Sequence, residues 1–234
     1  MKTLIVIPTY NEKDNIKSLL PAIKKYLPHA DTLVVDDASP DKTGAAVRAV
    51  MRVNKRVKLM ERKSKLGLGT AYVAGFKYAL AHNYDMIFEM DADFSHDPKY
   101  LPDFIESMKT NDLAIGSRYI NGISVVNWPI GRLILSKFAN FYARSITGVP
   151  LTDLTSGFKC YNSRVLKAID LDNIHSDGYA FQIEMHYKAW KKGFRIKELP
   201  IIFIDRHAGS SKMTRRVMLE AAWIVWKLKL GLIK

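Results

Sequence analysis

Short apolar segments alternate with segments of helical periodicity through the first 120 residues of this 234-residue chain, and this alternation constrains the fold more than any other feature. The apolar segments predict strands at Leu4–Ile7, Leu33–Val35, Val57–Met60, Met86–Met90 and Leu113–Ile115. The segments between them predict helices at Lys13–Leu27, Thr43–Val53, Leu66–His82 and Pro98–Met108, the last with Asp97 as its N-cap. Strands and helices that alternate at this spacing form βαβ units. We therefore expect an α/β fold with a mostly parallel, doubly wound (Rossmann-like) sheet and helices on both faces.

The second half of the chain has a different pattern. It predicts an amphipathic helix at Ile130–Ile146, strands at Gly157–Tyr161 and Ile196–Ile204, and a helix near Tyr179–Lys192. No linker, repeat or low-complexity segment separates the two halves, so we expect the second half to complete the same sheet. We expect the last residues, 213–234, to form a basic amphipathic helix.

The composition favours an anionic partner. Lys and Arg outnumber Asp and Glu by 36 to 23, which gives a formal net charge of +13. Such an excess suits a nucleic acid, a phosphorylated substrate or an acidic membrane. Cys160 is the only cysteine, so an internal disulfide is excluded, and no Cys and His spacing indicates a structural zinc; we expect a cytosolic compartment. Neither a signal-like segment nor an uncharged apolar run of about 18 residues is found, so no spanning helix is predicted.

Two aspartates follow the predicted strand at Met86–Met90. Asp91 and Asp93 stand two residues apart in MDADFSHDP, where the apolar run ends. Open α/β sheets bind ligands at the carboxyl ends of their strands, and paired carboxylates there suit Mg²⁺ or Mn²⁺ shared with substrate phosphates. Taken alone, the pattern fits a solvated acidic loop equally well.

Polar clusters also follow two other predicted strands. In VIPTYNE, Pro8 ends the strand, Tyr10 offers a flat ring to a base, and Glu12 offers an acceptor for a base or a sugar. In VVDDASPD, Asp36 offers another acceptor. Turn capping is the alternative for both clusters, because Asn, Asp, Ser and Pro are common turn residues.

These three segments, together with LGLGTAYVAGF at residues 66–76, resemble in order and spacing the inverting glycosyltransferases of family 2, which have the GT-A fold. Later segments narrow the resemblance to the dolichyl-phosphate mannosyltransferases; they are IGSRYING, NWPIGR, TSGFK, GYAFQIEM and ELPIIFIDRHAGSSK. The resemblance covers the chain from Leu4 to about Lys212. It implies a GT-A domain over residues 1–212.

The resemblance also implies roles for individual residues. It assigns donor binding to Pro8, Tyr10, Glu12, Asp36, Asp91, Ala92, Asp93, Arg118, Arg206 and Lys212. It assigns the acceptor phosphate to Arg132 and metal ligation to Asp91, Asp93 and Ser95, where Ser95 departs from the Gln of some relatives. We expect Asp93, Arg118 and Asp153 to take part in catalysis, with Asp153 as the acidic group nearest the acceptor; a structural role is the equally favoured alternative for Asp153.

The reaction implied by the resemblance moves mannose from GDP-mannose to a polyprenyl phosphate such as dolichyl phosphate, with inversion and with Mg²⁺ or Mn²⁺. A polyprenyl-phosphate glucosyltransferase that uses UDP-glucose is the nearest alternative, because the fold and the paired aspartates serve many nucleotide sugars. A nucleic-acid-binding protein would explain the charge, but the chain has no helix-turn-helix, zinc-finger or RNA-recognition signature. A catalytically inactive membrane scaffold is disfavoured by the acidic pair and the arginines.

Residues 215–234 combine aromatic, apolar and basic side chains. The apolar residues Trp223, Ile224, Trp226 and Leu228 suit the boundary of a bilayer, and neighbouring lysines suit anionic headgroups. We expect a helix that holds the protein on the cytoplasmic face of a membrane, with a membrane-anchor subunit as a possible partner. A helix that packs on the sheet or on a partner subunit is the alternative.

Overall fold

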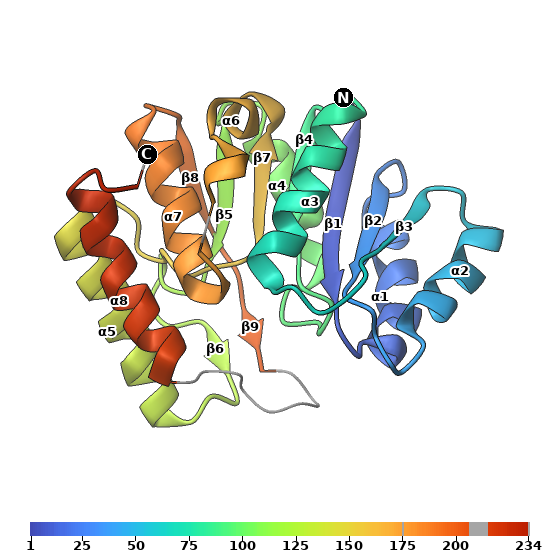
Figure 1. The fold of residues 1–234 in the computed structure, drawn as a ribbon, viewed down its shortest axis with the longest axis horizontal. Helices are drawn as coiled ribbons and strands as arrows, with labels where there is room; N and C mark the ends of the chain where they lie inside the picture. Colours follow the sequence, from blue (N-terminus) through green and yellow to red (C-terminus); the bar gives the residue numbers. More distant parts are fainter. Residues whose placement is uncertain (175, 206–214, 234) are drawn as a thin grey trace.

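A seven-stranded sheet forms the centre of the computed structural model (Figure 1). The structure describes residues 1–174, 176–205 and 215–233; in the last range, side chains are described from residue 222 onward. The strand order is β3-β2-β1-β4-β7-β5-β8. The strands are β1 Thr3–Thr9, β2 Asp31–Asp36, β3 Val57–Glu61, β4 Met86–Glu89, β5 Leu113–Ser117, β7 Lys159–Asn162 and β8 Ile196–Pro200. β7 is antiparallel to its neighbours β4 and β5, and the other pairs are parallel. The predicted α/β class with a mostly parallel sheet is confirmed.

Helices cover both faces of this sheet. One face carries α3 (Leu68–Ala81), α6 (Ser163–Ala168) and α7 (Gly178–Lys191), and the other carries α1 (Lys13–Tyr26), α2 (Thr43–Val53) and α4 (Leu101–Ser107). Because side chains alternate between the faces of a strand, Leu4 and Val6 join the core under α3, whereas Ile5 and Ile7 join the core under α1. Both faces are buried, which is why the strands are continuous apolar runs in the sequence.

Two predicted elements are each divided in the structure, and β6 (Val125–Val126), α6 and η2 (Leu171–Asn173) were not predicted. Asp97 caps its helix by accepting the Lys99 N–H at 2.9 Å, but the predicted helix Pro98–Met108 is a 3₁₀ turn, η1 (Pro98–Tyr100), followed by α4. The predicted strand Ile196–Ile204 is divided into β8 and β9 (Phe203–Ile204). β8 ends at Pro200, which has no N–H for a ladder bond. β9 then pairs in parallel with β6 in a separate two-stranded sheet.

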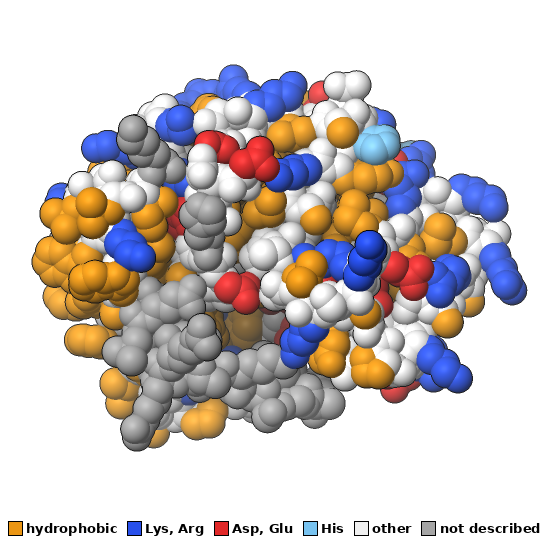
Figure 2. Space-filling view, viewed as in Figure 1, with side chains coloured by type: hydrophobic (Ala, Val, Ile, Leu, Met, Phe, Trp, Pro, Cys, Tyr) orange, Lys and Arg blue, Asp and Glu red, His pale blue; other side chains and the backbone are white. Residues whose placement is uncertain are grey.

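The helices α5 (Ile130–Thr147) and α8 (Arg215–Lys229) pack against each other at one end of the sheet (Figure 1). α5 is the predicted amphipathic helix, yet it turns polar side chains towards the protein. The Tyr119 hydroxyl donates to the Ser136 hydroxyl at 2.7 Å, and the side-chain oxygen of Asn140 accepts the Leu154 N–H at 2.7 Å. These bonds satisfy the buried polar groups. The C-terminal residues Tyr142 and Ile146 of α5 pack on the core, but Ile130, Ile134, Phe138 and Phe141 lie outside, and Figure 2 shows hydrophobic side chains gathered on this flank.

α8 contributes to both the core and the surface. Ile224, Val225 and Leu228 are buried, whereas Trp223 and Trp226 are exposed. The predicted apolar face of the tail is corrected accordingly: Ile224 and Leu228 pack inside the protein and do not face outward. No helix in the described part of the chain is long and apolar enough to cross a membrane.

A buried ion pair joins β4, β7 and α7 beneath the carboxyl edge of the sheet. The Lys159 ammonium lies 3.2 Å from Glu89 Oε2 and also donates to the Gln182 side-chain oxygen, while the Gln182 amide donates to Glu89 Oε1. All three side chains are buried. Burial raises the pKa of Glu89 to about 7 and lowers the pKa of Lys159, and the opposite charge of each partner opposes the shift. The charged form of each group is therefore stabilised by the charge of its partner.

Removing one charge of this pair is expected to destabilise the fold more than removing both. Lys159→Met or Glu89→Gln leaves one partner without its counterpart, which typically costs about 3–5 kcal/mol. The double variant removes both charges and should lose less free energy of unfolding than either single variant. Urea unfolding of the four proteins measures this coupling, and additive losses in the double variant would contradict it.

Candidate active site

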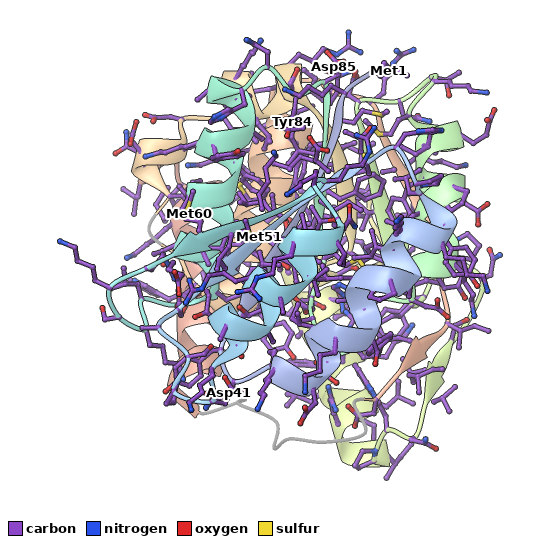
Figure 3. The ribbon with its side chains drawn as sticks, turned by 90° about the vertical axis from the view of Figure 1, so that its right-hand side faces the viewer. Met1, Asp41, Met51, Met60, Tyr84 and Asp85 are labelled. Atoms are coloured by element: carbon purple, nitrogen blue, oxygen red, sulfur yellow. The ribbon has the colours of Figure 1, made fainter. Side chains whose placement is uncertain are left out.

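Several chain segments meet at one edge of the sheet and form a pocket. In Figure 3, Met1 and Asp85, which precede β1 and β4, lie at one end of the molecule, and Asp41, which follows β2, lies at the other, carboxyl end. At that edge β4 leads into Asp91, β5 leads into Arg118, and the segment before antiparallel β7 returns. The pocket is lined by Asp91, Asp93, Ser95, His96, Arg118, Arg132, Thr155, Ser156, Gly157, Tyr179, Phe203 and Asp205.

The paired carboxylates both line this pocket. Asp91 Oδ1 accepts the Tyr72 hydroxyl at 2.7 Å, and Asp93 Oδ1 accepts the Ser95 hydroxyl at 2.5 Å and the Ser95 N–H at 3.1 Å. Among the residues that the structure describes, no group of three His, Cys, Asp or Glu side chains gathers around one point. Two carboxylates, Asp91 and Asp93, fit a divalent cation whose remaining ligands are phosphate oxygens. Ser95 lines the same pocket and supports Asp93 through these two bonds, and its role as a metal ligand stays a prediction.

His96 supports Asp91 from the interior. The Asp91 N–H donates to His96 Nδ1 at 2.9 Å, so the ring proton resides on Nε2. The ring is buried and stacks on Phe158 with 4.9 Å between centroids. Burial lowers the pKa of His96 against the attraction of Asp91 and Asp93, so the ring is neutral at pH 7.

Arg118 is held by a fully buried carboxylate. Its Nε donates to Asp153 Oδ2 at 2.7 Å and its Nη2 donates to Asp153 Oδ1 at 2.6 Å. Asp153 in turn is fixed through its N–H, which donates to Glu198 Oε1 at 2.9 Å. Burial lowers the pKa of Arg118, but the charge of Asp153 outweighs it and raises the pKa, so Arg118 stays charged. Asp153 does not line the pocket, and both its oxygens bind Arg118, so of its two expected roles the structure favours the structural one: it positions Arg118.

A second arginine enters the pocket from the first turn of α5. Arg132 Nη1 donates to Asp205 at 2.7 Å, and its guanidinium lies 4.1 Å from the centroid of Trp128. The Arg118 guanidinium lies 5.5 Å from the same ring and 5.5 Å from Phe203. Two cations therefore share one aromatic wall, and both retain N–H donors for an anion.

The protein-family model described as "Glycosyl transferase family 2" matches residues 4–170. The chain belongs to this family. It is 44% identical to the undecaprenyl-phosphate mannosyltransferase of Micrococcus luteus over 94% of this chain and 91% of the relative. It is 45% identical to the polyprenol monophosphomannose synthase of Mycolicibacterium smegmatis over 96% of this chain and 85% of the relative. The resemblance to the dolichyl-phosphate mannosyltransferases is thus confirmed, and the protein is a glycosyltransferase.

Solved structures agree on the fold. The glucosyl-3-phosphoglycerate synthase of Mycobacterium tuberculosis, in complex with Mn²⁺, uridine diphosphate and phosphoglyceric acid, superimposes with a TM-score of 0.71 at 16% identity. The match covers 98% of this chain and 78% of that structure. The GT-A fold is thereby confirmed for this family 2 member.

The predicted nucleoside residues lie outside the pocket described above. Asp36 uses its oxygens locally, accepting the Thr9 hydroxyl at 2.8 Å and the Ser39 hydroxyl at 2.6 Å. Glu12 accepts the Asn15 amide at 2.6 Å, and the Lys65 ammonium lies 3.9 Å from the centroid of Tyr10. Pro8 and Ala92 do not line the pocket either. Arg206 and Lys212 lie outside the described residues.

Several pocket residues were missed in the sequence. His96 stands in the same segment as the paired aspartates, so its place near them was open to prediction. Thr155, Tyr179 and Asp205 come from segments far apart in the chain, and only the fold brings them together. All three stand in segments that carry the family resemblance, so that resemblance was the signal that could have found them.

Asp153→Asn is expected to impair this glycosyltransferase through Arg118. Asparagine keeps one acceptor oxygen but removes the charge, which for a buried pair typically costs about 3–5 kcal/mol of unfolding free energy. The residual activity should keep the wild-type dependence on pH, because no proton donor or acceptor of the reaction is lost. Asp112→Asn is the matched control, since Asp112 is also buried and pairs with Arg164 and Arg195 away from the pocket. A pH profile that loses its acidic limb only in Asp153→Asn would restore Asp153 as a base.

Proposed function

We propose that this protein transfers mannose from GDP-mannose to a polyprenyl phosphate, with inversion, and so forms polyprenyl-phosphate mannose. The observation that carries the proposal is the pairing of two carboxylates with two arginines around one pocket. Asp91 and Asp93 suit a cation bound to a diphosphate, while Arg118 and Arg132 suit further phosphate oxygens. A reaction between a nucleotide diphosphate and a lipid phosphate needs such a site. The names of the two bacterial relatives support mannose as the sugar and a polyprenyl phosphate as the acceptor.

The proposed chemistry is a single displacement. An oxygen of the acceptor phosphate forms a bond to the anomeric carbon of mannose as the bond from that carbon to the diphosphate breaks, which inverts the configuration. A phosphate monoester has a second pKa near 6, so the nucleophile is largely ionised at pH 7 and needs no general base. The burial of Asp153 agrees with this requirement.

The arginines divide the anions between them in this proposal. Arg118 is fixed by Asp153 close to the paired carboxylates and is assigned to the leaving diphosphate, whose charge grows during transfer. Arg132 stands on α5 and is assigned to the acceptor phosphate. Bound Mg²⁺ or Mn²⁺ would neutralise charge on the diphosphate, with Asp91 and Asp93 as its protein ligands.

A screen of labelled nucleotide sugars tests the activity. GDP-mannose, UDP-glucose and GDP-glucose are each incubated with a short-chain polyprenyl phosphate and Mn²⁺, and the lipid product is extracted and counted. Transfer from GDP-mannose alone is expected, and transfer from UDP-glucose alone would replace the proposed donor.

Asp93→Ala and chelation are expected to abolish transfer. The substitution leaves the hydroxyl and N–H of the buried Ser95 without their acceptor, so the free energy of unfolding should fall by about 1–3 kcal/mol while the fold is kept. Glu106→Ala is the control, because this exposed carboxylate on α4 does not line the pocket and, among the described residues, forms an ion pair with Lys109. Full activity of the wild type in EDTA would refute the metal assignment.

We also propose that the enzyme reaches its lipid acceptor as a peripheral protein on the cytoplasmic face of a membrane. The flank formed by α5 and α8 exposes large apolar side chains: Ile130, Ile134, Phe138, Phe141, Trp223 and Trp226 (Figure 2). Isolated apolar side chains are ordinary on a surface, but a contiguous group beside a lipid-phosphate site indicates an interface. Lys137, Lys227 and Lys229 lie on the same two helices, and each basic residue near an anionic surface contributes about 1 kcal/mol.

Phe138→Glu is expected to reduce binding to vesicles that contain anionic lipid. Phe138 is 61% exposed, so the substitution leaves the core intact, and its charge opposes insertion into the headgroup region. Val53→Glu is the matched control, because Val53 is 83% exposed on α2, far from this flank in the fold. Co-sedimentation measures binding, and transfer to a water-soluble short-chain acceptor should stay at the wild-type level. Equal pelleting of both variants would refute this face, and absence of wild-type binding would favour a membrane-anchor subunit.

A further inference from the structure

Tyr72 lies behind the paired carboxylates and binds one of them. It belongs to α3, its side chain is fully buried, and its hydroxyl donates to Asp91 Oδ1 at 2.7 Å. We propose that Tyr72 is a positioning residue that occupies one oxygen of Asp91 and directs the other to the metal and its nucleotide. This inference rests on the proposed function, because it concerns how that function's metal and donor are held.

The Tyr72 ring has little freedom to move. Phe181 stacks on it with 6.0 Å between centroids and 6° between planes, and Phe76 stacks on it at 6.1 Å and 25°. The start of α3 is also fixed, because the Gly69 N–H donates to Asp177 Oδ1 at 2.6 Å. The hydroxyl is therefore presented to Asp91 from a rigid support.

The other oxygen of Asp91 is left accessible. The Asp91 backbone is fixed by His96, and the side chain is 35% exposed. A Cβ atom placed on Gly157 would lie 3.9 Å from Asp91 Oδ2, so the side chain that glycine lacks leaves room beside this oxygen. Oδ1 faces the core, whereas Oδ2 lies 3.9 Å from His96 Nε2, beyond hydrogen-bond distance, and faces the space beside Gly157, which suits a carboxylate that binds a cation through one oxygen.

Loss of the Tyr72 hydroxyl removes the bond that orients Asp91. Outer partners of metal ligands fix the geometry of the ligand, and their removal typically weakens metal binding by about 10–100-fold. Phenylalanine keeps the ring and its stacking on Phe76 and Phe181, so the packing of the core is preserved.

Tyr161 provides a matched control. It is also fully buried, belongs to the same core cluster, and contacts Phe76 with 5.4 Å between ring centroids. Its hydroxyl lies 3.4 Å from Glu89 Oε2, and it does not line the pocket. Tyr161→Phe therefore removes the same atom from the same core without touching Asp91.

Electron paramagnetic resonance of free and bound Mn²⁺ tests the inference, with whichever of GDP or UDP the wild type binds. Tyr72→Phe is expected to raise the Kd for Mn²⁺ at least tenfold, whereas Tyr161→Phe should stay within twofold of the wild type. A Tyr72→Phe value within twofold, or equal weakening by both variants, would overturn the proposal. Failure of the wild type to bind Mn²⁺ with either nucleotide would instead overturn the proposed metal-dependent function.

A double-mutant cycle separates positioning from general damage to the fold. In an Asp91→Asn background, Tyr72→Phe should change the Kd for Mn²⁺ less than twofold, because the group that it orients is already altered. A full tenfold loss in that background would show that Tyr72 acts on packing and would refute the role. Tyr72→Phe could also lower the thermal midpoint far more than Tyr161→Phe does. The cycle still separates positioning from damage in that case, because the same loss of stability is present when Tyr72→Phe is made in the wild type and when it is made in Asp91→Asn.

Discussion

The buried contact between Glu89 and Lys159 is the interaction on which the site depends. It ties β4 to the antiparallel strand β7 and, through Gln182, to α7. Asp91 stands two residues beyond Glu89, and Gly157 stands two residues before Lys159. The pair therefore sets the spacing of the two segments that face each other across the pocket. Because charges in a dry interior must stay paired, this spacing is enforced more strictly than apolar packing would enforce it.

The two arginines of the pocket are likewise held by acidic partners. Arg118 is oriented by Asp153, and the Asp153 backbone is held by Glu198 on β8. Arg132 is oriented by Asp205 and by the face of Trp128. Each cation that we assign to a phosphate thus has an acidic partner on its protein side. Among the described residues that line the pocket, three carboxylates accompany two arginines, so what the pocket offers is donors whose orientation is fixed before an anion arrives.

The fold was predictable from the sequence because most strands are buried on both faces, so that their apolar runs stand out from the amphipathic helices. Asp91 and Asp93 were predictable from their place at a strand end. The break at Pro200 was also readable, since proline interrupts a ladder. The place of β7 between β4 and β5 was not, because strand order depends on contacts between distant segments. Nor were the side-chain partners of Ser95 and Asp153, since a residue type does not reveal which neighbour its side chain binds.

The orientation of α5 was not predictable either, for a different reason. Its periodicity identified a helix with two unlike sides, but periodicity does not say which side faces the protein. The structure turns Ser136 and Asn140 inward, where Tyr119 and Leu154 satisfy them. An apolar face is left outside, contrary to the usual arrangement of a surface helix.

This inverted helix carries Arg132 in its first turn and Phe141 nine residues later. At about 1.5 Å of rise per residue, the two lie about 14 Å apart along one rigid axis. In the proposed orientation, the residue that takes the lipid phosphate and the residues that meet the bilayer move as one body. The depth at which the proposed acceptor phosphate is taken is then set by the length of this helix and not by the lipid.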